Sequence, residues 1–137
     1  MIRSILFLCV ANSARSQMAE GLARQIFGPD YTIQSAGSQP SFVHPMAIQA
    51  LGELGIRTEA HSSKSVQDID LSQVDLILTL CAEEICPLAP GKIQRLHWPL
   101  PDPAAPAANA AGQLENFRRV RDQLAARLGQ LKQELEA

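Results

Sequence analysis

Cys9 and Arg15 are separated by five small or polar residues, a spacing that suits chemistry on a tetrahedral oxyanion. An apolar run at residues 5–8 precedes this segment, and residues 17–27 read as a helix. The N–H groups at a helix N-terminus and its positive dipole form an anion-binding cradle. Arg15 can hold two anion oxygens, and the same positive charge favours the reactive thiolate of Cys9. The segment predicts an anion-binding loop with a nucleophile built in, rather than a buried strand-end thiol beside a solvated arginine.

Strands and helices are expected to alternate along the chain. The apolar patterns predict four strands, at residues 3–8, 31–35, 74–80 and 94–98. They predict helices at residues 13–27, at 45–54 with Gly55 as the cap, and at 113–137, where leucines recur at three- and four-residue steps. A turn or short helix is expected near residues 68–71, and residues 99–112 read as a loop rich in Pro and Ala.

This alternation predicts an α/β fold in which a four-stranded parallel sheet has helices on both faces, within a single domain of residues 1–137. Ligands of such sheets bind beyond the carboxyl ends of the strands. Cys9 follows the first strand, Cys81 follows the third, and Asp102 lies beyond the fourth. We therefore expect these three side chains at one rim of the sheet.

The composition excludes several classes of protein. The chain has 137 residues, of which 46% are hydrophobic and 19% charged, as in a globular domain. A net charge of −2 without a run of Lys or Arg argues against nucleic acid and acidic membranes as partners. The first apolar run is too short for a membrane span or a signal peptide, so we expect a cytoplasmic protein. We also expect a monomer. The three cysteines do not suggest a disulfide framework or a metal site.

Taken together, these motifs resemble those of the thioredoxin-coupled arsenate reductases, which have the low-molecular-weight protein tyrosine phosphatase fold. The resemblance begins with the segment at residues 9–21 and covers nearly the whole chain in order. It continues through Ser35-Ala36-Gly37, His44-Pro45, Leu78-Thr79-Leu80-Cys81, His97-Trp98, Asp102-Pro103 and the segment at residues 117–122.

The resemblance implies reduction of arsenate to arsenite, with phosphate or sulfate as competing oxyanions. Cys9 would attack arsenate, and Asp102 would protonate the departing oxygen. Cys81 would then attack Cys9 and release arsenite, Cys86 would attack Cys81, and thioredoxin would reduce the resulting disulfide. The implied oxyanion-binding residues are Val10, Ala11, Asn12, Ser13, Ala14, Arg15 and Ser16, with Ser16 also donating a hydrogen bond to Cys9 or capping the helix.

The spacing of Cys81 and Cys86 limits this relay. Four residues separate them, fewer than the family pattern has, and positions five apart on a rigid helix do not face each other. Pro87 and Pro90-Gly91 favour a loop in which the two sulfurs could meet. The alternative is that Cys86 is incidental and that glutathione with glutaredoxin resolves the adduct.

The resemblance further implies a potassium site formed by Asn12, Glu20, Ser35 and Ser62. The carboxylate that this pattern expects after the paired hydroxyls Ser62-Ser63 is absent, and Lys64 stands there instead. The charge of Lys64 is thus an alternative to the ion. No tightly bound cofactor is expected otherwise. Asn12 is expected to adopt a left-handed backbone conformation, which Asn tolerates well.

Two other functions share these residues. A tyrosine phosphatase would use Cys9, Arg15 and Asp102 without Cys81 and Cys86, but it would expect a proline at Gln17 and aromatic residues around a deep pocket. The chain has one Tyr and one Trp. An oxyanion-binding redox sensor would use the Cys81 and Cys86 pair as a switch. His61 and His97 are expected to be structural, and Arg118, Arg119 and Arg121 to form a solvated face.

Overall fold

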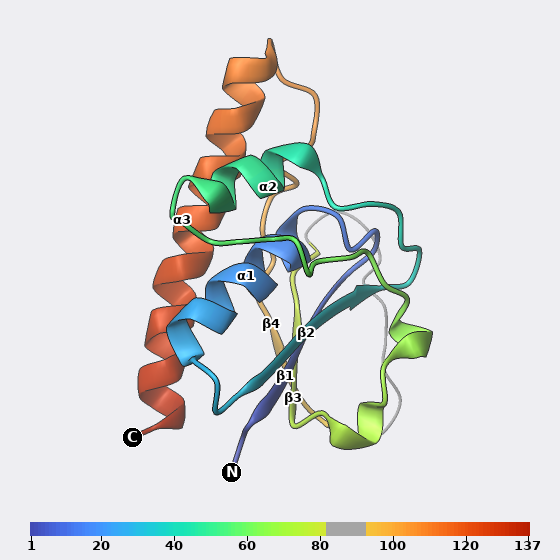
Figure 1. Ribbon diagram of the computed structural model, residues 1–137, viewed down its shortest axis with the longest axis vertical. Coiled ribbons are helices and arrows are strands. Elements are labelled where there is room, and N and C mark those ends of the chain that lie inside the picture. The colour runs from blue at the N-terminus through green and yellow to red at the C-terminus, as the bar shows by residue number, and fades with distance from the viewer. Residues whose placement is uncertain (82–92) are drawn as a thin grey trace.

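The computed structural model describes residues 1–81 and 93–137 and has a parallel β-sheet at its centre (Figure 1). The sheet has four strands in the order β2-β1-β3-β4, all parallel. The strands are β1 (Ser4–Cys9), β2 (Thr32–Gly37), β3 (Leu76–Thr79) and β4 (Gln94–His97). All six residues of β1 are buried, because neighbouring strands and both layers beside the sheet cover it. The predicted four-stranded parallel sheet is confirmed.

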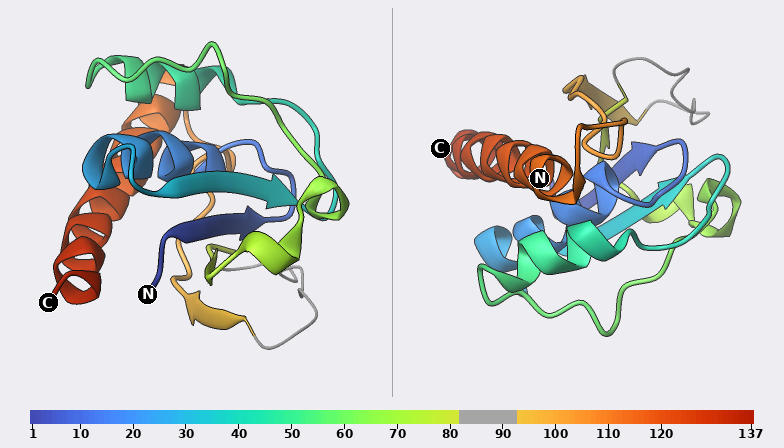
Figure 2. Two further views of the ribbon diagram at one scale, coloured as in Figure 1. Left: turned by 60° about the horizontal axis from the view of Figure 1, so that its bottom comes forward. Right: turned by 90° about the horizontal axis from the view of Figure 1, so that it is seen from above.

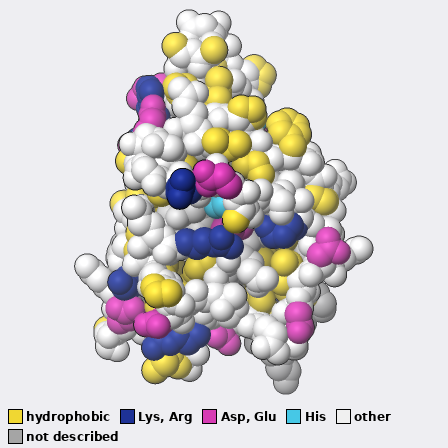
Figure 3. Space-filling model, in the orientation of Figure 1, with side chains coloured by type: hydrophobic (Ala, Val, Ile, Leu, Met, Phe, Trp, Pro, Cys, Tyr) yellow, Lys and Arg dark blue, Asp and Glu magenta, His cyan; other side chains and the backbone are white. Residues whose placement is uncertain are grey.

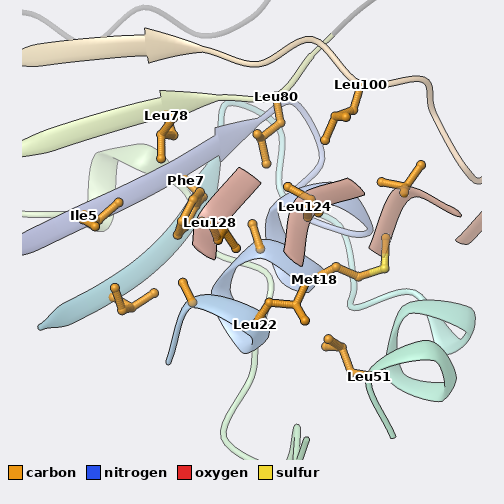
Figure 4. Packing of buried hydrophobic residues seen from close by; sticks show 14 of the residues in the cluster. Ile5, Phe7, Met18, Leu22, Leu51, Leu78, Leu80, Leu100, Leu124 and Leu128 are labelled. Carbon is orange, nitrogen blue, oxygen red and sulfur yellow. The ribbon is translucent and has the colours of Figure 1, made fainter. Parts of the chain in front are cut away.

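Three α-helices cover one face of this sheet: α1 (Arg15–Phe27), α2 (Pro45–Gly52) and α3 (Ala110–Leu135). Figure 2 shows α3 running past α1 and α2 on the same side of the strands. The core between them contains Phe7 of β1, Met18 of α1 and Leu124 of α3, all fully buried (Figure 4). This layer holds α1 firmly above the strand that ends at Cys9.

Two short 3-10 helices, η1 (Val66–Asp68) and η2 (Leu71–Gln73), lie on the opposite face. Apolar side chains of these turns pack on Leu6, Leu8 and Ile77, the strand residues that point away from the α-helices. The sheet therefore has helices on both faces, as predicted, although one layer consists of 3-10 turns in the described residues.

Helix ends differ from the predicted ones where capping groups decide them. The helix α3 begins at Ala110 rather than Gln113, because the side chain of Asn109 accepts a hydrogen bond from the Gly112 N–H at 2.8 Å. The helix α2 ends at Gly52, and Gly55, with a φ of 76°, lies beyond it in the following turn.

The prediction of a solvated arginine face on α3 is wrong for Arg121. This residue is 8% exposed, and its guanidinium donates to the Ala50 carbonyl at 3.0 Å and to Glu53 at 2.7 Å. Arg118 binds the same Glu53 carboxylate at 2.6 Å. Both arginines thus join α3 to the end of α2. Arg119 bonds Asn116 on the surface of its own helix.

In residues 1–81 and 93–137, the structure contains no helix long and apolar enough to cross a membrane.

Candidate active site

Cys9 and Arg15 lie on either side of one tight turn at the carboxyl edge of the sheet. Cys9 is the last residue of β1 and Arg15 the first of α1. A cavity of about 230 Å³ opens above the turn. Its lining residues come from the turn and from two other loops: Cys9, Val10, Ala11, Ser13, Ala14, Arg15, Ser41, Asp102 and Ala104. The structure therefore brings the predicted nucleophile, the arginine and the predicted acid to one cavity.

The Cys9 side chain is a free, buried thiol that contacts the hydroxyl of Ser16. The two atoms, Cys9 Sγ and Ser16 Oγ, are 2.9 Å apart. Asn12 Nδ2 donates to the same Ser16 oxygen at 2.8 Å, so the Ser16 hydrogen can point at the sulfur. A thiolate at Cys9 carries no hydrogen and can only accept this bond, which stabilises its charge.

Asn12 fixes the shape of the turn. Its φ is 48°, and it is the only residue other than glycine with positive φ in the part of the chain that the structure describes. Its buried Oδ1 accepts from the Lys64 N–H at 2.8 Å and from Gln17 Nε2 at 3.1 Å. These bonds hold the left-handed conformation that the sequence predicted for Asn12.

The segment after β4 positions the other two groups of the cavity. The Arg15 side chain is buried, and its NH1 group donates to the Leu100 carbonyl at 3.0 Å. Two residues farther on, Asp102 Oδ1 accepts from the Ala104 N–H at 2.9 Å, which fixes the carboxyl group in the cavity wall. Sequence reasoning missed Leu100, because its contribution is a backbone carbonyl that no residue type signals.

Gly37 lets the turn lie directly on the end of β2. A Cβ atom at this position would lie 2.9 Å from both Asn12 N and Cys9 O, and closer still to Val10 O. All three neighbours are backbone atoms of the turn, so none can rotate away. The glycine at the end of Ser35-Ala36-Gly37 is thus required by the turn of residues 9–15, the predicted anion-binding turn.

Two serines from other loops support the turn, and one of them, Ser41, also lines the cavity. Ser63 Oγ donates to the Ala11 carbonyl at 2.9 Å and accepts from the Ser41 N–H at 2.9 Å. The paired hydroxyls at positions 62 and 63 were the sequence signal for this contact. Next to them, His44 accepts from the Met46 N–H at 3.1 Å and caps α2. Burial lowers the pKa of His44, against the opposing charge of Asp102.

Glu20 is 1% exposed and lies at the centre of a polar cluster below the turn. Ser35 Oγ donates to Glu20 Oε1 at 2.6 Å, and the Lys64 ammonium lies 3.7 Å from the same oxygen. Arg24 lies 3.2 Å and His61 3.6 Å from Glu20 Oε2. Burial lowers the pKa of His61, while Glu20 opposes that shift. His61 is therefore a structural member of this cluster, bonded also to Gln17 at 3.0 Å.

This cluster contains the four residues predicted to hold potassium, and each of them bonds protein groups there. The Ser62 carbonyl accepts from Lys64 Nζ at 3.0 Å and from Gln17 Nε2 at 2.9 Å. Asn12 Oδ1 and the Ser35 hydroxyl bond protein groups as well. With the ammonium of Lys64 between Glu20 and Ser62, the donor set does not fit a potassium ion.

Cys81 lies at the same edge of the sheet as Cys9. It is buried, and it follows β3, the strand next to β1. The Leu80 N–H donates to the Leu8 carbonyl at 3.0 Å, so the pairing of the two strands continues up to the residues beside Cys9 and Cys81. Cys81 is disulfide-bonded, and Cys9 is not. Cys86 lies outside the described residues, and so does the predicted loop around Pro87.

Comparisons with known proteins agree with this geometry. An arsenate reductase of Staphylococcus xylosus is 40% identical over 124 residues, which is 89% of this chain and 90% of the relative. A solved structure described as an arsenate reductase in the phosphate binding state has a TM-score of 0.80 and 32% identity, covering 97% of this chain and 98% of the other. A thioredoxin-dependent arsenate reductase of Corynebacterium glutamicum has the same fold, with a TM-score of 0.76 and 24% identity over 98% of this chain and 62% of the other.

A family model extends this agreement to almost the whole chain. The model for the low molecular weight phosphotyrosine protein phosphatases matches residues 4–137. These residues include the anion-binding turn, both faces of the sheet and the helix α3. The chain therefore belongs to the low molecular weight phosphotyrosine protein phosphatase family.

Proposed function

We propose that this protein reduces arsenate to arsenite, with Cys9 as the nucleophile. The observation that carries the proposal is the second buried cysteine, Cys81, at the end of the strand beside the one that ends at Cys9. Hydrolysis of a phosphate ester needs one cysteine at this edge, whereas a two-electron reduction needs a second thiol. The 40% sequence identity to an arsenate reductase of Staphylococcus xylosus also supports reduction over ester hydrolysis.

Binding comes first in the proposed reaction. Arsenate enters the cavity above the turn, where backbone N–H groups and the Arg15 guanidinium face its oxygens. The Leu100 carbonyl holds the guanidinium in place, so little ordering is left for the substrate to induce. Phosphate and sulfate have the same shape and charge, and they should compete for this cradle.

The first bond forms between Cys9 Sγ and arsenic. The thiolate attacks the As(V) centre, one As–O bond breaks, and Asp102 gives its proton to the departing oxygen, which leaves as water. The Ser16 hydroxyl releases its hydrogen bond to the sulfur as the negative charge moves onto the bound oxyanion.

Reduction occurs when a second sulfur attacks the first. The Cys81 thiolate attacks Cys9 Sγ, an S–S bond forms, and the electron pair of the S–As bond stays on arsenic, which leaves as As(III). Cys86 then attacks Cys81, which restores the Cys9 thiolate and leaves a Cys81–Cys86 disulfide. A dithiol of the thioredoxin class reduces that disulfide and returns the enzyme to its starting state.

Two reductant systems separate the thioredoxin route from its alternative. The measurement is arsenate-dependent oxidation of NADPH, with thioredoxin and its reductase in one arm and glutathione with glutaredoxin in the other. We expect sustained turnover of the wild type in the thioredoxin arm, and a single turnover of the Cys86→Ser variant. Equal turnover of both proteins in the glutaredoxin arm alone would make Cys86 a bystander.

The same proteins also test the phosphatase alternative. Cys81→Ser should abolish arsenite production, while any cleavage of a small aryl phosphate should survive, since that reaction uses only Cys9, Arg15 and Asp102. Ester cleavage at an enzymatic rate with no arsenite from the wild type would overturn the proposal and favour a phosphatase.

A further inference from the structure

The buried carboxylate of Glu20 needs positive charge, and the chain supplies it at both oxygens: Arg24 lies 3.2 Å from Oε2 and the Lys64 ammonium 3.7 Å from Oε1. A buried carboxylate without compensation is strongly destabilising. Of the basic groups around Glu20, Arg24 has a side chain that is 48% exposed and Lys64 one that is 30% exposed. On the face of the molecule that Figure 3 shows, Lys and Arg side chains lie around a histidine near the centre.

Lys64 has contacts that a bound cation would have. Its ammonium lies 3.7 Å from Glu20 Oε1 and donates to the Ser62 carbonyl at 3.0 Å. An ammonium group is a compact point charge with several donors, so it can satisfy the same carbonyl and carboxylate oxygens as a monovalent metal ion. The lysine side chain brings this charge at no cost in binding entropy.

The same residue connects the charge to the anion-binding turn. The backbone N–H of Lys64 donates to Asn12 Oδ1 at 2.8 Å, and its carbonyl accepts from the Gly37 N–H at 2.9 Å. The Ser62 carbonyl that receives the ammonium also receives Gln17 Nε2, which reaches Asn12 as well. The charge beside Glu20 and the shape of the turn are therefore coupled through a few short hydrogen bonds.

We propose that the Lys64 ammonium is a built-in cation that takes the place of potassium beside Glu20, and that this protein is stable without potassium. This role of Lys64 concerns the structure of the turn and is independent of arsenate reduction. Removing the ammonium should open a site for a monovalent cation.

Thermal unfolding in chloride salts of equal ionic strength tests this proposal without any enzymatic assay. The salts are potassium, sodium and choline chloride, so that general screening is the same in all three. For the wild type we expect Tm values in the three salts that agree within about 1 °C, because the Lys64 ammonium already occupies the position beside Glu20.

The Lys64→Asp variant replaces the ammonium by a second carboxylate next to Glu20. Its Tm should fall in choline chloride and rise by roughly 4 °C in potassium chloride, as for a ligand at about ten times its Kd. The matched control is Lys132→Asp, the same change of charge in the last turn of α3. This control should show no difference between potassium and sodium.

A neutral variant covers the case in which Lys64→Asp does not fold. Lys64→Gln should have a lower Tm than the wild type in choline chloride and should recover part of the loss in potassium chloride. Two results would overturn the proposal: a potassium-selective rise of the wild-type Tm, or Lys64 variants whose response to potassium equals that of Lys132→Asp.

Discussion

Replacing Gly37 by alanine should damage the anion-binding turn although the change adds only one methyl group. The new Cβ would lie 2.9 Å from Asn12 N and Cys9 O, and nearer to Val10 O. Overpacking of this kind costs about 1–3 kcal/mol, which corresponds to a fall of the Tm of roughly 3–10 °C for a chain of this length. A displacement of the loop by about 1 Å should lower kcat/KM for arsenate by about 100-fold.

Gly129→Ala is the matched control, since it adds the same methyl group inside α3. Apart from its chain neighbours and the backbone of its own helix, no heavy atom lies within 4 Å of a Cβ built there. Alanine is the better helix former by about 1 kcal/mol, so the Tm should rise by roughly 2–4 °C while the activity stays unchanged.

Scanning calorimetry with and without phosphate, together with the reduction assay, measures both variants. Opposite shifts of the Tm, and loss of the phosphate-dependent stabilisation in Gly37→Ala alone, would agree with a turn that rests on Gly37. A Gly37→Ala variant that retains the wild-type Tm and kcat/KM would show that the turn does not need glycine at this position.

Three further perturbations follow from the same contacts. Ser16→Ala should lower kcat/KM for arsenate by about 10- to 100-fold, because the Cys9 thiolate loses its hydrogen bond; wild-type kinetics would contradict that bond. Asp102→Asn should lower kcat by about 10²- to 10⁴-fold in a pH–rate profile, and an unchanged kcat would remove Asp102 as the acid. Arg118 and Arg121 of α3 lower the pKa of Glu53 from 4.5 to about 2, and the hydrogen bonds from Arg118 are the largest cause. This pairing stabilises the fold above pH 4.5 and is lost as the pH falls toward 2, so Glu53→Gln should have a lower Tm than the wild type near neutrality and an equal one near pH 2. A Tm difference that does not depend on pH would contradict this linkage.

Local patterns explain why the core of the site could be predicted from the sequence. The turn between Cys9 and Arg15 lies between an apolar strand and a helix, and those two elements are encoded by neighbouring residues. The placement of Asp102 needed more, namely the rule that parallel strands end at one edge. Both conditions follow from residue type and order, and the cavity unites the three residues.

Contacts between distant residues explain what the sequence did not reveal. Arg121 reads as a solvated helix residue until Glu53, 68 residues away, is brought beside it by the packing of α3 on α2. In the sequence, Lys64 is only a departure from the family pattern, because its partners, Glu20 and the Ser62 carbonyl, depend on how the chain folds. The start of α3 depended on a single capping side chain, Asn109.

The chemistry of Cys9 can be tested most directly with a single turnover. The protein is fully reduced, freed of reductant and mixed with arsenate, and then arsenite and free thiols are counted. We expect about one arsenite per chain and a fall from three free thiols to one, with neither change in Cys9→Ser. Wild-type protein that binds arsenate but keeps all its thiols and yields no arsenite would contradict the role of Cys9 as the nucleophile of the reduction.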